Sequence, residues 1–219
     1  MNQKVNLYGF RFGMTAFIAN ALFVIVQTLQ LLRVLKYPLD EIFIYGFSLC
    51  IVIPFVLEML TLHYVTPADK KFWSHAALIF TIIYAVFVTA NYVVQLATVI
   101  PMTLKGTLEK TSVLIQTPHS MFWDFDAIGY ISMGLAMLLA LPVFEKQGFQ
   151  RWVRISFLAN ALVTPLIAFV YFYPEFSESL LLLAIPWTIT APLAMLLLAI
   201  MFKKNMGIEN LINEGIEKE

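Results

Sequence analysis

Six long apolar stretches dominate the pattern of hydrophobic and polar positions, and short polar or proline-marked connections separate them. The stretches cover residues 12–33, 41–63, 75–100, 126–144, 154–173 and 179–202. A helix that crosses the hydrocarbon core of a bilayer needs about 20 residues at a rise of about 1.5 Å each. The pattern therefore predicts an all-α polytopic membrane protein with six transmembrane helices. Residues 1–204 would form one transmembrane domain and residues 205–219 a short cytoplasmic tail.

Composition strengthens this interpretation. Hydrophobic residues make up 60% of the chain and charged residues 13%, which leaves too little polar surface to cover a water-soluble particle. The lipid bilayer is the expected environment and first partner. The formal net charge of zero gives no electrostatic footprint for nucleic acid, so no nucleic-acid partner is expected.

The basic residues predict the orientation of the spans, because Lys and Arg near span ends stay on the cytoplasmic side. With six spans, ten basic residues would lie on the face that holds both termini and four on the other face. We therefore expect both termini in the cytoplasm.

The first and fifth apolar stretches share a phrase, "FIANAL" at residues 17–22 and "FLANAL" at residues 157–162. Each phrase places an asparagine, Asn20 or Asn160, nine residues after an arginine. An amide in hydrocarbon must find a hydrogen-bond partner, and the flanking alanines let another backbone come close. We expect these asparagines to hold helices together, with ligand contact as the alternative.

Glu58 lies well inside the second apolar stretch, one turn after Pro54. An acid within a membrane span is a functional candidate, because an ionised carboxylate there is costly unless it is paired or hydrated. Together with Asn20 and Asn160, at similar depth, it is a candidate proton or cation site. The alternative is that Glu58 reaches toward the interface or is neutralised by the asparagines.

Polar and aromatic residues gather in the predicted outer half of the spans. The candidate ligand-binding residues are Gln27, Gln30, Asn91, Gln95, Asp124, Asp126, Tyr130, Trp187 and Thr190. If they converge, they would form an outward-facing pocket of acids, amides and aromatic faces, which suits a cationic or amphipathic small molecule. The alternative is an interfacial aromatic belt with polar residues joining the helices.

The three histidines do not predict a metal site. His63 and His75 flank a predicted cytoplasmic loop, whereas His119 belongs to an outer loop about 30 Å away across the membrane. A weaker site of His63, His75 and Asp69 has the right ligand types for zinc, but its spacing matches no local motif. We expect no metal, and the sequence identifies no cofactor.

No catalytic motif stands out, since a phosphate-binding glycine loop and a nucleophile elbow are both missing from the sequence. A non-enzymatic protein is therefore expected. The enzymatic alternative is a membrane-embedded hydrolase, which would need His119 within reach of Asp124 or Asp126.

Two segments outside the spans carry further expectations. The connection 101–125 mixes apolar residues with a few charges, so we expect it to lie in the interface or to fold back over the helices. In the tail, Ile208, Leu211, Ile212 and Ile216 share one helical face, which predicts a short amphipathic helix, with a frayed terminus as the alternative.

The stretch "DFDAIGYISMG" at residues 124–134 and the stretch at residues 151–204, which begins "RWVRISFLANALVTPLIAF", resemble a group of small bacterial multi-pass membrane proteins that share a domain of unknown function. The resemblance implies a single-domain helical protein in the cell (inner) membrane and supplies no reaction. In size, helix number and an alanine-rich first span, the chain is also similar to the substrate-binding components of vitamin uptake systems, which are usually richer in glycine.

The function expected from these features is that of a binding or sensing module, or a small transporter, for a small molecule. A vitamin-uptake component and a membrane hydrolase are the alternatives. A third class is a structural subunit, working as a homo-oligomer or with a partner subunit. In that class Asn20 and Asn160 would face lipid or a second chain.

Overall fold

A computed structural model describes the main chain of residues 2–107 and 112–216 and the side chains of residues 3–107 and 112–207. Six of its helical segments are long and apolar enough to cross a membrane. They are Gln3–Leu31, Leu39–Val65, Ala68–Leu104, Met121–Val143, Gln150–Phe172 and Glu178–Gly207. Over the described ranges the chain has no β-strand. The prediction of an all-α, multi-pass membrane protein with six spans is confirmed.

The eight α-helices run beyond most of the apolar stretches that predicted them. Their bounds are α1 Asn2–Leu31, α2 Leu39–Val65, α3 Lys71–Val94, α4 Ile100–Leu104, α5 Met121–Ala140, α6 Gln150–Phe172, α7 Glu178–Leu181 and α8 Trp187–Ile216. Because main-chain hydrogen bonding continues through polar residues at the membrane surface, a helix does not end where its apolar pattern ends. The largest differences are at the start of α1, which begins at Asn2 and not at residue 12, and at the end of α8, which ends at Ile216 and not at residue 202.

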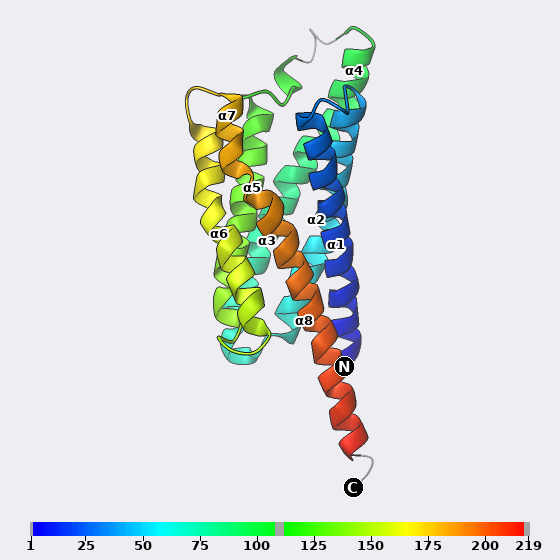
Figure 1. Cartoon of the computed structure of the whole chain (residues 1–219), viewed down its shortest axis with the longest axis vertical. Helices are drawn as coiled ribbons and strands as arrows, with labels where there is room; N and C mark the ends of the chain where they lie inside the picture. The colour runs from blue at the N-terminus through cyan, green and yellow to red at the C-terminus, as the bar shows by residue number, and fades with distance from the viewer. Residues whose placement is uncertain (1, 108–111, 217–219) are drawn as a thin grey trace.

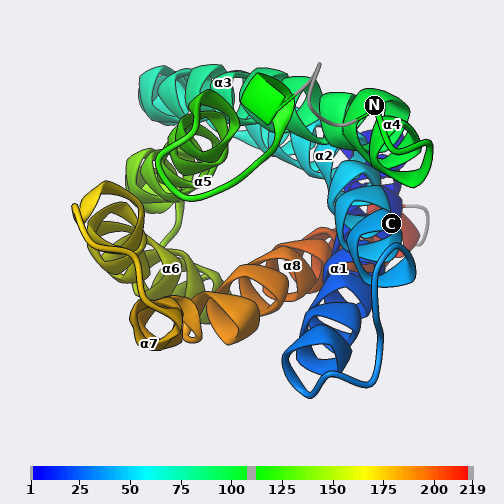
Figure 2. The ribbon, with the colours of Figure 1, turned by 90° about the horizontal axis from the view of Figure 1, so that it is seen from above.

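The long helices form a closed ring in the order α1, α2, α3, α5, α6 and α8, with α8 also packed against α1 (Figure 2). Both termini lie at one end of the bundle, called here the terminal end (Figure 1). The connections that follow α1, α4 and α6 lie at the opposite end, called the loop end. Which end faces the cytoplasm stays a prediction.

The outer surface of the bundle is apolar. Large aliphatic side chains such as Ile53 and Leu162 are 68% and 66% exposed, whereas Phe55, Met195 and Phe202 are completely buried in the interior. An apolar exterior over a packed interior is the arrangement that lipid requires, and a water-soluble protein rarely has one of this extent.

Two glycines let three pairs of helices approach closely. A Cβ atom added at Gly134 of α5 would lie 1.7 Å from Oγ1 of Thr164 in α6. A Cβ atom added at Gly13 of α1 would lie 2.2 Å from Oε1 of Glu58 in α2 and 2.7 Å from Cβ of Ala199 in α8. Small residues at such contacts allow the van der Waals packing that joins helices in lipid.

The connection between α4 and α5 folds back over the bundle, as predicted for its second half. The Gln95 side chain donates to the Leu114 carbonyl (2.8 Å) and accepts from the Gln116 main-chain N–H (3.2 Å). Gln95 begins a π-helical turn, Gln95–Val99, that joins α3 to α4. Residues 108–111 of this connection are outside the described part.

Helix α8 is longer than the predicted sixth span and continues to Ile216. The side chains of residues 208–219 are outside the described part, so the amphipathic face of Ile208, Leu211, Ile212 and Ile216 stays a prediction.

Candidate functional site

Asp126 is the centre of the most extensive polar cluster near the loop end. Helix α5 begins at Met121, where the Ser120 hydroxyl caps it by accepting from the Trp123 N–H at 3.2 Å. This start lies five residues before the predicted one, so Asp126 occupies the second turn and not the first residue of the span. Its side chain points into the bundle and is 4% exposed.

Four side chains donate hydrogen bonds to the Asp126 carboxylate. Oδ1 accepts from the Tyr92 hydroxyl at 2.7 Å and the Asn91 amide at 3.3 Å. Oδ2 accepts from the Tyr171 hydroxyl at 2.5 Å and the Gln116 amide at 3.1 Å. Hydrogen bonds to an ionised acceptor are about twice as strong as neutral ones, so this arrangement stabilises a negative charge away from water.

A second layer of amides fixes the donors in place. The Asn91 amide also donates to the Gln116 side-chain oxygen at 3.0 Å, and the main chain around Gln116 is held by Gln95. The hydroxyl groups of Tyr92 and Tyr130 are 3.0 Å apart. Helices α3, α5 and α6 and the folded-back connection therefore all contribute to one network.

A cavity of about 340 Å³ opens beside this network. Two acids, Asp126 and Glu41, line it, and within the described part no Lys, Arg or His does so. Aromatic side chains form much of its wall: Phe23, Tyr45, Tyr92, Trp123, Tyr130, Tyr171 and Trp187. Gln27, Gln30 and Gln116 add amide groups, and the remaining lining residues are mainly aliphatic.

The aromatic wall is built from edge-to-face and tilted ring pairs. Trp187 packs edge-on against Tyr130, with ring centroids 4.9 Å apart, and against Phe23 at 5.9 Å. Trp123 and Tyr171 are 4.5 Å apart. Edge-to-face and tilted ring pairs are the arrangements that aromatic side chains prefer, and the faces of such rings attract cations.

The structure brings some of the predicted ligand-binding residues to the cavity and leaves others away from it. Those that line it are Gln27, Gln30, Asp126, Tyr130 and Trp187. Asn91 and Gln95 lie behind the wall, in the network that supports Asp126. Asp124 is exposed on the outside of α5, and the Thr190 hydroxyl donates to Asn160.

Several residues of the site were not predicted from the sequence to bind a ligand. These are Glu41, Tyr45, Tyr92, Gln116, Trp123 and Tyr171. Tyr92 follows the selected Asn91 directly, so it was the easiest of them to find. Tyr171 belongs to a span with no other polar signal at that depth, and its relation to Asp126 depends on how α6 packs against α5.

Glu58 lies at the junction of α1, α2 and α8, toward the terminal end. It is 0% exposed, and both of its carboxylate oxygens are buried with no hydrogen-bond partner among the described residues. Its neighbours include Gly13 and Ala199. No hydrogen bond in the described part joins Glu58 to Asn20 or Asn160, so these three predicted site residues do not form one cluster.

The two asparagines both bond to α8, from opposite sides of it. The Asn160 side-chain oxygen accepts from the Thr190 hydroxyl at 2.9 Å, whereas the Asn20 amide donates to the Met195 sulfur at 3.6 Å. Both asparagines are buried. These contacts support the interpretation that they join helices. They do not show the lipid-facing or partner-facing asparagines that the structural-subunit alternative expects.

The histidines lie apart from the Asp126 site. His63 is 2.9 Å from the Ser74 hydroxyl, and its ring centroid is 5.5 Å from that of His75, at the terminal end. His119 is exposed, and among the described residues it makes no hydrogen bond to Asp124 or Asp126. The hydrolase alternative needs that contact. Over the described ranges, no three His, Cys, Asp or Glu side chains converge as metal ligands would.

Comparisons of the chain with family models, with curated proteins and with solved structures found no match. The site must therefore be interpreted from its own geometry.

Proposed function

We propose that this protein binds a small organic cation in the cavity beside Asp126, and that it acts as a binding or sensing module or as a small transporter. The observation that carries the proposal is the composition of the cavity. Two acids and a wall of aromatic rings line it, and no basic side chain does so within the described part. A cation gains from both the ring faces and the carboxylates.

The network around Asp126 supports the same proposal. Asp126 receives hydrogen bonds from four side chains and still borders the cavity. The donors hold the charge in one position, so a ligand would meet a preorganised anion. We further propose that the chain resides in the cell (inner) membrane with the loop end outward, as its basic residues predict.

A binding experiment with a matched pair of probes tests the proposal. One probe is a phenylalkyl trimethylammonium ion, and the other is its neutral tert-butyl isostere, which has the same shape without the charge. Trp123 and Trp187 line the cavity, so their fluorescence reports binding to the purified protein. We expect the cation to bind at least about tenfold more tightly than the isostere, since a desolvated cation–π contact with a nearby anion contributes about 2 kcal/mol or more.

Two variants on α5 provide the control. Asp126→Asn keeps the size of the side chain and removes its charge, so it should lower the preference for the cation to the part that Glu41 and the aromatic rings contribute. Asp124→Asn removes the same charge two residues away, on an exposed position that does not line the cavity, and should leave the preference unchanged. Equal binding of both probes to the wild-type protein would contradict the proposal.

A further inference from the structure

A second cavity, of about 490 Å³, lies at the terminal end, away from the Asp126 site. Lys70 borders it from the connection between α2 and α3, and Arg154 borders it from α6. The segment after α5 completes the lining with Pro142, Phe144, Glu145, Lys146 and Gln147. Three cations and one acid therefore share this space.

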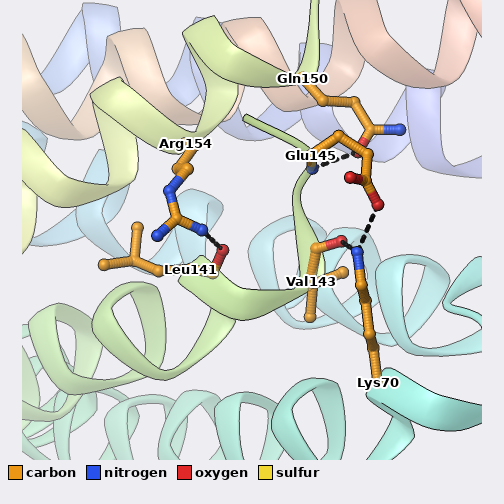
Figure 3. A network of polar contacts seen from close by, with 6 residues as sticks. All are labelled: Lys70, Leu141, Val143, Glu145, Gln150 and Arg154. Atoms are coloured by element: carbon orange, nitrogen blue, oxygen red, sulfur yellow. Dashed lines mark hydrogen bonds and ion pairs between the residues drawn. The ribbon is translucent and has the colours of Figure 1, made fainter. Parts of the chain in front are cut away.

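The wall of this cavity is held by hydrogen bonds to main-chain carbonyls, as Figure 3 shows. The Lys70 ammonium donates to the Val143 carbonyl at 3.3 Å and to the Glu145 carboxylate at 2.5 Å. The Arg154 guanidinium donates to the Leu141 carbonyl at 2.5 Å. Both carbonyls belong to the last turn of the α5 segment, so the two cations also cap that helix end.

The loop that follows is fixed as well. The Glu145 main-chain N–H donates to the Gln150 side-chain oxygen at 2.8 Å (Figure 3). Gly148 has a φ of +62°, a conformation that favours glycine, and it turns the chain back into α6. The segment that carries Lys146 is therefore a defined turn in this structure.

The charges of this cavity are not balanced. Lys70 pairs with Glu145, the only acid of the lining, which leaves Lys146 and Arg154 without an acid partner among the described residues. A guanidinium has five N–H donors, and only one hydrogen bond of Arg154 is present. Lys146 makes no hydrogen bond or ion pair within the described part. Two cations with free donors, beside one cavity, form a site for an anion.

The position of the cavity indicates the kind of anion. It lies where the spans end, next to the first turns of α3 and α6, which carry the exposed Trp73 and Trp152, and tryptophan is enriched at the depth of lipid headgroups. Phe144 and Pro142 give it an apolar side next to the cations. We propose that this cavity binds a phosphate group, supplied either by the headgroup of an anionic lipid or by a soluble phosphorylated ligand. Basic pockets at span ends bind lipid headgroups by this chemistry.

The experiment compares two single-charge variants. Lys146→Gln removes a cation that lines the cavity and has no bonding partner in the described part, so the fold should tolerate it. Arg151→Gln removes an exposed cation from the first turn of α6 that does not line the cavity. Both changes lower the basic charge of the terminal end equally. A difference between the two variants in phosphate binding therefore results from the cavity and not from the overall charge.

Two arms distinguish the sources of phosphate. In the first, the protein is extracted from bilayers of phosphatidylcholine with phosphatidylglycerol, and native mass spectrometry counts the anionic lipids retained. In the second, inorganic phosphate and pyrophosphate are titrated into the protein in bilayers of phosphatidylcholine alone. In at least one arm, we expect Lys146→Gln to lower the affinity about fivefold, because it removes a charge-assisted contact with the phosphate group in the cavity, and Arg151→Gln, which does not line the cavity, to lower it less than about twofold.

The double variant Lys146→Gln with Arg154→Gln should lose nearly all of this binding. Loss only in the first arm identifies a lipid headgroup, and loss only in the second identifies a soluble phosphate. Equal losses in Lys146→Gln and Arg151→Gln, or no phosphate binding in either arm, would overturn the proposal. None of these outcomes depends on the cation site beside Asp126.

Discussion

Asp126 and Glu58 are both acids enclosed within membrane spans, but their surroundings are opposite. Asp126 receives four hydrogen bonds and borders a cavity. Glu58 receives none from the described residues, and small residues of α1 and α8 cover it. By its position within its apolar stretch alone, Glu58 would be the stronger candidate for a functional residue. Our proposed binding site depends on the donors around Asp126 and on the space beside it, and burial alone would not have distinguished it from Glu58.

The largest effect that the comparison predicts comes from Asp126→Ala. This change removes the acceptor of four donors, of which Asn91 and Tyr92 are buried, and buried donors without a partner are costly. We expect the free energy of unfolding to fall by about 3 kcal/mol, measured by reversible unfolding in mixed micelles. Asp124→Ala, on the exposed side of the same turn, should cost less than about 1 kcal/mol.

A smaller fall in the free energy of unfolding is expected from Gly13→Ala, which tests how closely its neighbours enclose Glu58. The added methyl group would lie 2.2 Å from the Glu58 carboxylate and 2.7 Å from the Ala199 methyl group. Overpacking of this kind costs about 1–3 kcal/mol. Gly46→Ala in α2 is the control, because an added Cβ meets nothing within 4 Å there.

Combining Gly13→Ala with Glu58→Ala makes the same test sharper. Removal of the carboxylate relieves the shorter of the two contacts at Gly13, so the double variant should be more stable than the sum of the single effects by about 1 kcal/mol. Strict additivity would show that Glu58 does not occupy the position described here.

Glu58→Met should raise the free energy of unfolding, whereas Asp126→Ala should lower it. A methionine has a similar length and no carboxyl group to bury, and a buried polar group without a hydrogen-bond partner costs about 1–3 kcal/mol. We expect a gain near the lower end, about 1 kcal/mol. A lower free energy of unfolding in the same measurement would show that the Glu58 carboxyl group has a polar partner.

The smallest effect concerns a third acid, Glu145, which is exposed at the terminal end. The Lys70 ammonium donates a hydrogen bond to its carboxylate and attracts it electrostatically, and this lowers the pKa of Glu145. A carboxyl group with a lower pKa in the folded state stabilises the protein above its unfolded pKa, and the contribution is lost as pH falls through the folded pKa.

Melting temperatures of the wild-type protein and Glu145→Gln, compared over a range of pH, test this prediction. The wild type should be slightly the more stable at neutral pH, and the difference should vanish in acid. Because water and salt screen an exposed pair, the difference should also shrink as salt is added. A difference that grows in acid would reverse the sign of the prediction.

The fold was largely predictable because the bilayer sets the length of an apolar helix. Six apolar stretches gave six spans, but the ends of the helices were not predictable from hydropathy, which does not mark where main-chain hydrogen bonding stops. The start of α5 shows the consequence. Placing it at residue 126 made Asp126 a residue of the membrane surface, whereas the cap at Ser120 puts it inside the bundle.

The site was predictable only in part, for a different reason. Asp126, Tyr130 and Trp187 were selected because polar and aromatic residues near one level of a bundle tend to converge. Tyr171 lies 45 positions from Asp126 along the chain, and Gln116 comes from a connection whose path no periodicity describes. Contacts of this kind depend on which helices are neighbours, and one sequence does not contain that information.

The position of α8 between α1 and α6 has a consequence for the synthesis of this protein. The ribosome delivers this helix after the other five spans, and it brings Met195, Thr190 and Ala199, which cover Asn20, Asn160 and Glu58 respectively. Until it inserts, a nascent chain presents two amides and a carboxyl group to lipid, where such groups are unstable. Chains that stop short of α8 should therefore be recognised by membrane quality control and degraded, however completely their first five spans have inserted.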